Sequence, residues 1–217
     1  MKRPAICHVF GAGTPPVRKP AIRARDYVIA ADGGYSYAKN AGIRTDVLIG
    51  DFDSLKQMPP RGKDSPAILR LPKEKELTDL LAALRYGLDK GFCRFHLYGA
   101  AGGRLDHTVA SVQCLSYLLN HGARGYLFDR NTIITAMRGE IHLAPRRRGI
   151  ISVFALGEHA QGVSLTGLKY ELDNVCLRND FPLGVSNEFT GLPARIKVES
   201  GALLVAYPYG TREMNDL

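Results

Sequence analysis

The 217-residue chain contains no tryptophan and only four cysteines, and none of its apolar runs approaches the ~20 residues that a membrane-spanning helix needs. The cysteines lie far apart in the sequence and form no C-x-x-C pair, so neither a zinc site nor a redox dithiol is indicated, and we expect buried, reduced thiols. The apolar run in the segment MKRPAICHVFGAG is too short for a secretion signal. We therefore expect a globular cytoplasmic protein.

The charge balance is basic, with 29 Lys and Arg residues against 21 Asp and Glu residues and a formal net charge of +8. Such an excess is typical of proteins that bind anionic ligands or nucleic acids, and it also occurs as a solubility feature. The densest basic run, Arg146 to Arg148, lacks interleaved aromatic residues, so a solvated linker face is a better interpretation than a nucleic-acid contact. Charge alone leaves the ligand class open.

The first part of the chain alternates short apolar runs with amphipathic stretches. Apolar residues recur at helical spacing in ELTDLLAALRYGLDK and in HTVASVQCLSYLLNHG, which predicts a helix in each. The remaining apolar runs predict the strands of an α/β sheet. These runs are AICHVFGAG, YVIAAD, DVLIGD, AILRLP, FHLYGA and GYLFD.

Beyond Pro145 the pattern changes to short β-prone pieces that are separated by Gly, Asn and Pro and show no helical periodicity. This pattern is typical of an antiparallel β domain. We place the boundary within Leu143 to Gly149 and predict two domains, residues 1–144 and 145–217. The expected architecture is α/β, with a mostly parallel, Rossmann-like sheet domain followed by a smaller antiparallel β-sandwich domain.

Acidic residues directly follow two of the predicted strands. Asp32 comes after YVIAA, and Asp51 and Asp53 come after DVLIG. Ligands of an open parallel sheet bind outside the carboxyl ends of its strands, so these carboxylates are expected at one rim. The spacing of Asp51 and Asp53 points both side chains to the same side of an extended chain, where they could hold one Mg²⁺. A turn followed by a helix cap accounts for the same residues, and the local sequence leaves both interpretations open.

A further polar group opens the first predicted helix. Thr78 and Asp79 are suited to cap the amino terminus of this helix and to interact with its dipole. Lys75 precedes them, where an ammonium group could reach a phosphate. Capping and phosphate binding are equally consistent with this group.

The stretch GAAGGRLDH follows another predicted strand and leads into the second helix. Its glycines, among them Gly102 and Gly103, allow close backbone approach, and Arg104 offers a rigid fork of donors suited to phosphate. Asp106 and the histidine after it begin the helix, whose unpaired N–H groups favour an anion. The spacing matches neither a P-loop nor the dinucleotide fingerprint, and a plain turn with a surface arginine is the alternative.

In this order, A-D-G-G, G-D-F-D-S, K-E-L-T-D and G-A-A-G-G-R-L-D-H resemble the motifs of the thiamine pyrophosphokinases, also called thiamin diphosphokinases. The resemblance spans Ala30 to Leu119 and continues through T-G-L-K-Y-E-L and G-V-S-N-E-F. It implies transfer of a pyrophosphoryl group from ATP to the hydroxyl of thiamine, giving thiamine diphosphate and AMP, with Mg²⁺ required. It also implies a homodimer whose sites lie where two subunits meet.

The resemblance implies roles for the residues of these motifs. Asp51, Asp53 and Asp79 would be the catalytic metal ligands, with Asp32 near the same centre. Arg104 would act on the phosphates during catalysis. The other residues implied for the phosphates and the nucleotide are Lys75, Thr78, Gly102, Gly103 and Asp106.

The resemblance places thiamine against the β domain, through Tyr170, Ser186 and Asn187. Because the chain has no tryptophan, Tyr170 would supply the aromatic face for the cationic thiazolium ring. Asn187 can donate and accept hydrogen bonds at once, which suits the aminopyrimidine ring. A β-turn at Ser186 and Asn187 is the local alternative.

Two other functional classes remain open from the sequence. The acidic rim would also suit a pyrophosphokinase of another alcohol, or an Mg²⁺-dependent nucleotide hydrolase that releases AMP without thiamine. A basic RNA-binding module, in which the aspartates are caps, would bind nucleic acid with an affinity that falls steeply as salt rises. That interpretation puts acidic residues on the rim where RNA would have to sit, so we expect an enzyme of thiamine and ATP without a nucleic-acid or membrane partner.

Overall fold

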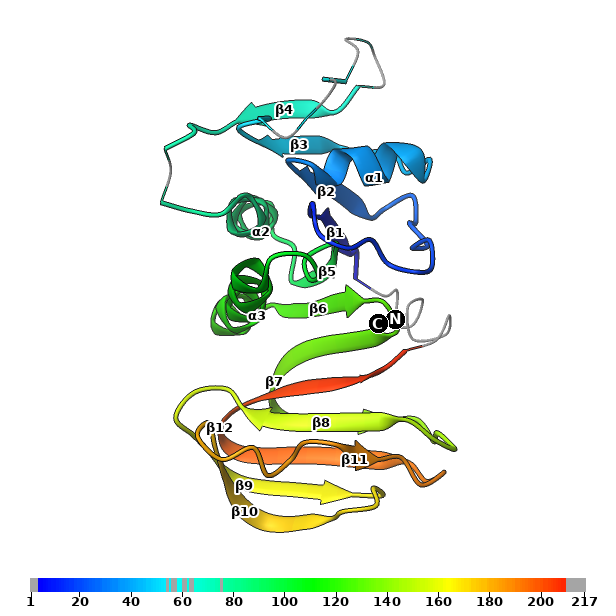
Figure 1. Cartoon of the computed structure of the whole chain (residues 1–217), viewed down its shortest axis with the longest axis vertical. Coiled ribbons are helices and arrows are strands. Elements are labelled where there is room, and N and C mark those ends of the chain that lie inside the picture. The colour runs from blue at the N-terminus through cyan, green and yellow to red at the C-terminus, as the bar shows by residue number, and fades with distance from the viewer. Residues whose placement is uncertain are drawn as a thin grey trace. The chain divides into compact units, whose positions relative to one another are not determined.

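The computed structural model describes residues 4–209 except 54, 56–57, 60–61, 63–64 and 75. Contacts between residues divide the described chain into two compact units, the first ending at Asn131 and the second beginning at Thr132 (Figure 1). The first unit is a mixed α/β structure with few helices, and the second consists of β-strands. The division by contacts thus comes before the change of sequence pattern near residue 145.

A parallel sheet forms the centre of the first unit. Its strands lie in the order β6-β5-β1-β2-β3-β4, and every neighbouring pair is parallel. Strand order reverses at β1, which has β2 on one side and β5 on the other. Such a reversal opens a crevice at the carboxyl ends of the neighbouring strands β1 and β5. The strands are β1 (Cys7–Phe10), β2 (Tyr27–Ala31), β3 (Val47–Gly50), β4 (Ala67–Arg70), β5 (Arg94–Tyr98) and β6 (Arg124–Asp129).

Helices cover both faces of this sheet. Figure 1 shows α2 (Asp79–Asp89) and α3 (Leu105–Asn120) on one face and α1 (Gly34–Asn40) on the other. Close packing under α2 requires a glycine, because a Cβ atom at Gly87 would lie 2.6 Å from the Phe95 ring. None of the helices in the described ranges is long and apolar enough to cross a membrane.

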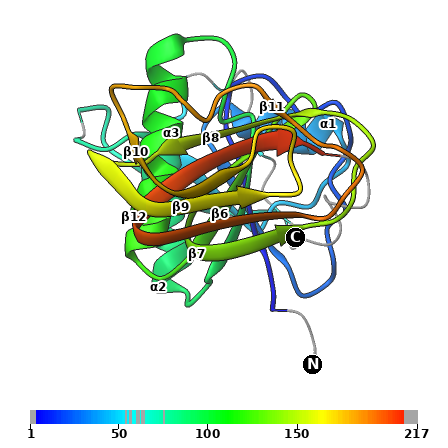
Figure 2. The ribbon, with the colours of Figure 1, turned by 90° about the horizontal axis from the view of Figure 1, so that it is seen from below.

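The second unit is built from antiparallel strands around the long strand β12 (Ala194–Pro208). Figure 2 shows β12 between β7 and β9, and its later half also pairs with β8. A shift of register between Val198 and Leu203 separates the half that pairs with β9 from the half that pairs with β8. The other strands are β7 (Thr132–Leu143), β8 (Ile150–Ala155), β9 (His159–Thr166), β10 (Leu172–Arg178) and β11 (Asn187–Glu188).

Two expectations differ from these observations. The division of the chain comes at Asn131 and not at residues 144 and 145, because β7 pairs with β12 along its length and so belongs to the second unit. All four cysteines are free thiols, but only Cys7 and Cys114 are buried, while Cys93 and Cys176 are exposed.

Candidate active site

A pocket of about 600 Å³ lies within the first unit, where loops leave the carboxyl ends of β1, β2, β3 and β5. Its position is the crevice that the reversal of strand order predicts. Most of the residues that the sequence singled out in this unit line it together. They are Asp32, Asp51, Asp53, Thr78, Asp79, Gly102, Gly103 and Arg104.

Three carboxylates form a cluster in this pocket. One side-chain oxygen from each of Asp32, Asp51 and Asp53 lies within 4.8 Å of the others. The Oδ1 atom of Asp32 is buried and, within the described chain, lacks a hydrogen-bond partner. A buried carboxylate oxygen without a partner is costly unless a cation neutralises it, so these residues fit a divalent metal ion.

The backbone of the rim fixes the position of Asp32. Its N–H donates to the carbonyl of Ile49 at 2.8 Å, and its φ of 44° lies in the left-handed region, which few non-glycine residues adopt. Gly50 packs against it so closely that a Cβ atom there would lie 3.0 Å from the Cβ of Asp32. A side chain at position 50 would therefore press on the carboxylate cluster.

Asp51 and Asp53 belong to a tight turn. The Oδ1 atom of Asp51 accepts a hydrogen bond from the N–H of Asp53 at 3.1 Å, and Phe52 between them has a φ of 68°. The Phe52 ring is buried with Ala30 and Tyr35. The Asp51 carboxylate therefore forms the turn and also belongs to the carboxylate cluster.

Thr78 is the amino-terminal cap of α2, since its hydroxyl accepts a hydrogen bond from the N–H of Leu81 at 3.2 Å. Asp79 occupies the first turn of this helix and lines the pocket. Among the described residues, the three carboxylates close enough to share one cation are those of Asp32, Asp51 and Asp53. Asp79, which was expected as a metal ligand, is not in this group. Lys75 lies outside the described residues.

Two glycine-containing loops, which follow β1 and β5, line the pocket and are joined by backbone hydrogen bonds. The N–H of Gly13 donates to the carbonyl of Gly99 at 2.7 Å, and the N–H of Thr14 donates to the carbonyl of Ala101 at 2.9 Å. A Cβ atom at Gly11 would lie 2.7 Å from the carbonyl oxygen of Gly99, so the loops approach too closely for a side chain there. The loop after β1 was not predicted as part of the site, although a G-A-G stretch directly after a strand is a signal for it.

Arg104 is bound by Asp106 on the exposed first turn of α3. The Arg104 Nε donates to Oδ1 of Asp106 at 3.1 Å, and this hydrogen bond lowers the pKa of the Asp106 carboxyl. Arg104 lines the pocket, whereas Asp106 is not among its lining residues.

His107 and Ser111 also line the pocket, and neither was predicted as a site residue. They lie one turn apart on α3, and the Ser111 hydroxyl donates to the carbonyl of His107 at 2.8 Å.

In the second unit, Tyr170 and Asn187 hold each other through reciprocal hydrogen bonds. The Asn187 Oδ1 accepts from the N–H of Tyr170 at 2.9 Å, and its Nδ2 donates to the Tyr170 carbonyl at 2.6 Å. Asn187 is buried, while Tyr170 is 58% exposed. Ser186 has a φ of 59°, and its N–H donates to the hydroxyl of Ser152. The Asn187 amide therefore shapes the loop that presents the Tyr170 ring.

Family models match both units. The model described as thiamin pyrophosphokinase, catalytic domain, matches residues 19–127, and the model described as thiamin pyrophosphokinase, vitamin B1 binding domain, matches residues 139–203. The chain belongs to the thiamin pyrophosphokinase family. Membership confirms the resemblance seen in the sequence motifs and supports ATP-dependent pyrophosphoryl transfer to thiamine, and the hydrolase and RNA-binding alternatives are not favoured.

Individual thiamin pyrophosphokinases extend this similarity over most of the chain. The thiamine pyrophosphokinase of Bacillus subtilis is 30% identical over 181 residues, which cover 82% of this chain and 85% of that protein. A crystal structure of the B. subtilis enzyme has a TM-score of 0.80 at 23% identity and covers 94% of this chain and 98% of that one. The structure of thiamin pyrophosphokinase from Candida albicans has a TM-score of 0.71 at 15% identity, covering 95% of this chain and 89% of that one. The two structures show a shared fold.

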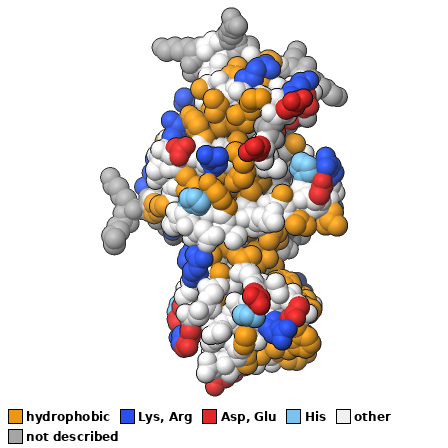
Figure 3. All heavy atoms as spheres, turned by 90° about the vertical axis from the view of Figure 1, so that its left-hand side faces the viewer, with side chains coloured by type: hydrophobic (Ala, Val, Ile, Leu, Met, Phe, Trp, Pro, Cys, Tyr) orange, Lys and Arg blue, Asp and Glu red, His pale blue; other side chains and the backbone are white. Residues whose placement is uncertain are grey.

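The basic run is divided between two environments. Arg147 and Arg148 are exposed, as a solvated face predicts. The Arg146 guanidinium instead lies over the Phe189 ring at 5.4 Å and the Tyr207 ring at 5.7 Å. On the face in Figure 3, Lys and Arg side chains are scattered among acidic and hydrophobic ones, unlike the continuous basic patch typical of a nucleic-acid site.

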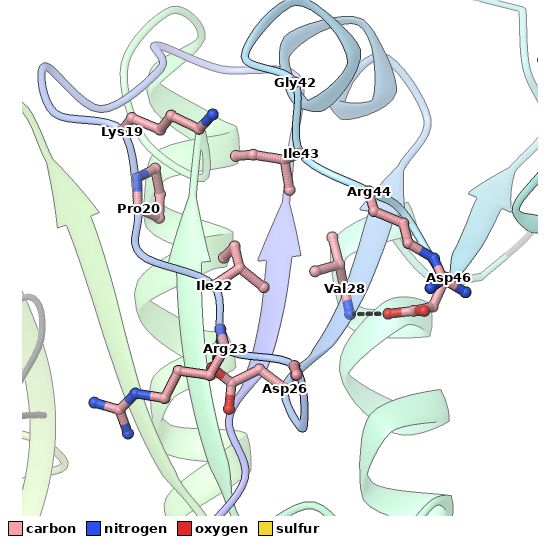
Figure 4. Close-up of a pocket in the computed structure, with 11 residues that line it drawn as sticks. Lys19, Pro20, Ile22, Arg23, Asp26, Val28, Gly42, Ile43, Arg44 and Asp46 are labelled. Atoms are coloured by element: carbon pink, nitrogen blue, oxygen red, sulfur yellow. Dashed lines mark hydrogen bonds between the residues drawn. The ribbon is translucent and has the colours of Figure 1, made fainter. Parts of the chain in front are cut away.

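A second pocket of about 350 Å³ lies before the amino ends of β2 and β3, on the edge of the sheet away from the carboxylate cluster. Figure 4 shows its two carboxylates, of which Asp46 accepts from the N–H of Val28 at 2.8 Å. Asp26 accepts from the N–H groups of Ile6 and Arg23. These acids anchor the backbone where strands begin, so the larger pocket is the candidate active site of the chain.

Proposed function

We propose that the larger pocket transfers a pyrophosphoryl group from ATP to the hydroxyl of thiamine and releases AMP. The observation that carries this proposal is the carboxylate cluster of Asp32, Asp51 and Asp53, with its buried, unpartnered Asp32 oxygen. A site that handles a nucleotide and its metal ion needs carboxylates beside phosphate-binding groups, and this pocket combines the two.

Asp32, Asp51 and Asp53 would hold Mg²⁺, with Asp79 adding negative charge on the same pocket wall. When bound, Mg²⁺ neutralises phosphate charge and orients the transferred group. We add Asp32 to the expected metal ligands, because its carboxylate lies close to those of Asp51 and Asp53. Its burial also keeps its carboxylate from being fully hydrated by water, which strengthens its attraction for a cation.

ATP would bind across the crevice of the Rossmann-like sheet domain. Its phosphates would accept hydrogen bonds from the backbone N–H groups of Gly102 and Gly103 and from those of the first turn of α2, which follows Thr78. Arg104 would exchange its contact with Asp106 for the phosphates, because its guanidinium forms the same forked pair with either anion. Lys75 would add a further positive charge.

In the reaction, the thiamine hydroxyl oxygen attacks the β-phosphorus of ATP and the bond from that phosphorus to the α-β bridging oxygen breaks. AMP leaves with the bond electrons, and the hydroxyl proton passes to a basic oxygen of the site. Such transfers depend mainly on position and on neutralised charge. The protein's part is therefore to align the hydroxyl with the leaving oxygen and to stabilise charge through Arg104.

Thiamine would rest against the β-sandwich domain, with its cationic ring on the exposed face of Tyr170, an attraction of about 0.5–2 kcal/mol. Asn187 and Ser186 would shape the pocket around the aminopyrimidine ring. We further propose a cytoplasmic homodimer in which each site combines the β domain of one subunit with the carboxylates of the other.

One assay tests the proposed reaction. The purified protein is incubated with ATP, Mg²⁺ and thiamine, and nucleotides and thiamine phosphates are separated by chromatography. AMP and thiamine diphosphate are expected in equal amounts, with none of either when thiamine or Mg²⁺ is omitted. AMP formed without thiamine would favour the nucleotide hydrolase instead, and ADP with thiamine monophosphate would contradict pyrophosphoryl transfer.

A further inference from the structure

The residue between the two aspartates of the metal loop is bulky and has an uncommon backbone conformation. Phe52 has a φ of 68°, in the left-handed region that disfavours residues with a Cβ atom. Such a conformation persists only when the surroundings hold it in place. Phe52 is 7% exposed and packs in a buried cluster with Ala30, Tyr35 and Leu48, which secure it from the side of the sheet.

Arg70 secures the same loop from the other side. Its guanidinium carbon lies 4.9 Å from the centre of the Phe52 ring, and its Nη1 donates a hydrogen bond to the carbonyl oxygen of Asp51 at 3.2 Å. Strand pairing brings Arg70 here, because it is the register partner of Gly50 at the end of β3. The residue after it, Leu71, donates its N–H to the Gly50 carbonyl at 2.8 Å.

We propose that Arg70 is a positioning residue that holds Asp51 and Asp53 in the geometry that binds the metal ion. The inference rests on the proposed metal-binding role of these aspartates. The contacts of Arg70 fix both the carbonyl of Asp51 and the Phe52 ring between the two aspartates. The carboxylates of Asp51 and Asp53 therefore keep their common direction. Without Arg70, Phe52 keeps its packing in the core but loses the contacts that hold the turn at Asp51. A change in the φ and ψ of Phe52 would then turn Asp53 away from Asp51.

The chemistry of the contact supports a positioning role over direct metal or substrate binding. A cation beside a metal site weakens metal binding through charge repulsion, so the charge of Arg70 does not explain its presence. The contacts shown are to a carbonyl oxygen and an aromatic face, and a planar guanidinium makes both at once, whereas a lysine ammonium lacks the plane to stack. Arg70 is also exposed, so its removal leaves no cavity in the core.

The test measures metal binding directly, with Mn²⁺ as the probe and electron paramagnetic resonance of free Mn²⁺ as the readout. Outer partners of metal ligands are worth about 10–100-fold in metal affinity, so we expect Arg70→Ala to weaken Mn²⁺ binding at least ~10-fold. The Mg²⁺ concentration for half-maximal activity is expected to rise similarly, while the thiamine KM at saturating Mg²⁺ stays within ~2-fold of wild type. Arg85→Ala, which removes an exposed arginine from α2, is the matched control and is expected to bind Mn²⁺ as wild type does.

Two further variants separate positioning from a general loss of structure. Arg70→Lys keeps the charge without the stacking plane and is expected to show most of the Arg70→Ala effect. In a Phe52→Leu background, Arg70→Ala is expected to weaken Mn²⁺ binding by a smaller factor than in wild type, because the ring contact is already gone and only the hydrogen bond to the Asp51 carbonyl is still lost. Unchanged Mn²⁺ binding in folded Arg70→Ala, or full binding in Arg70→Lys, would overturn the inference. If wild type itself binds no Mn²⁺, the proposed metal site fails instead.

Discussion

The Oδ1 atom of Asp51 accepts a hydrogen bond from the backbone N–H of Asp53 at 3.1 Å. An Asx turn of this kind needs a side-chain carbonyl oxygen, which asparagine also has. A metal ligand of this type needs the negative charge, which asparagine lacks. Replacement of Asp51 by asparagine therefore removes the ligand and keeps the turn, and this separates the two interpretations that the sequence left open.

Thr78 is expected to contribute to the stability of α2 through its cap. Thr78→Ala removes the hydroxyl that accepts from the N–H of Leu81 and is expected to lower the free energy of unfolding by ~1 kcal/mol. Thr78→Ser retains the oxygen and serves as the control, with a loss below ~0.5 kcal/mol. Urea unfolding measures both, and equal stability of wild type and Thr78→Ala would show that the cap contributes nothing.

Arg104 is expected to act on ATP. Arg104→Ala is predicted to raise the KM for ATP by more than it raises the KM for thiamine, because the guanidinium fork is assigned to the phosphates. Steady-state kinetics with each substrate varied in turn make the comparison. A rise confined to the thiamine KM would contradict the assignment.

Asp26 is expected to make the fold sensitive to acid. Burial raises the pKa of Asp26, but hydrogen bonds from His8 and from the N–H groups of Arg23 and Ile6 outweigh burial and lower the pKa to about 2. The pKa in the folded state is below the unfolded value of 3.8, so this stabilisation is complete above about pH 4 and is lost as the pH falls toward 2.

The matching variant is Asp26→Asn, which places an amide against N–H donors and is expected to lower the free energy of unfolding at pH 7 by ~1–3 kcal/mol. Its stability is also expected to change less than that of wild type between pH 4 and pH 2. Urea unfolding across this range measures both effects, with the exposed Asp89→Asn as control. An acid dependence as steep as that of wild type would rule out Asp26 as its source.

The proposed sharing of sites between subunits predicts that two inactive variants rescue each other. Asn187→Ala alters the β domain and Asp53→Asn alters the carboxylate cluster, so a mixed dimer has both lesions in one site and an intact second site. Random exchange of equal amounts makes about half of the dimers mixed, and activity should approach about a quarter of wild type if each variant alone is inactive. Verified exchange without recovery would place the whole site in one chain or exclude Asn187 from it.

The sequence predicted the features of this fold that depend on local pattern. Strand and helix periodicity located α2 and α3 and the strands of the first unit, and the cap at Thr78 follows from residue type alone. Helix α1 was not predicted, because its seven residues are too few to show a helical period. Strand β7 looked like the end of the first domain because its pairing with β12 is not visible in local sequence.

The features of the candidate site that depend on local pattern were also predictable. The strand ends that carry Asp32, Asp51 and Asp53 could be read from the chain, whereas the buried, unpartnered oxygen of Asp32 depends on the packing of three strands. The contact of Arg70 with the Asp51 carbonyl joins residues 19 positions apart through strand register. Sequence pattern thus located the rim of the site, and tertiary contacts determine which atoms on it meet.

The most direct test of the account is the formation of AMP and thiamine diphosphate by Asp51→Asn and Asp53→Asn beside wild type and the control Asp89→Asn. Each asparagine variant is expected to lose at least ~10²-fold in turnover with its thermal unfolding midpoint unchanged, because it loses metal-stabilising charge and keeps the turn. Wild type and Asp89→Asn are expected to give both products in equal amounts. Near-normal turnover in either folded asparagine variant would contradict the account, because that aspartate would then be a turn residue only.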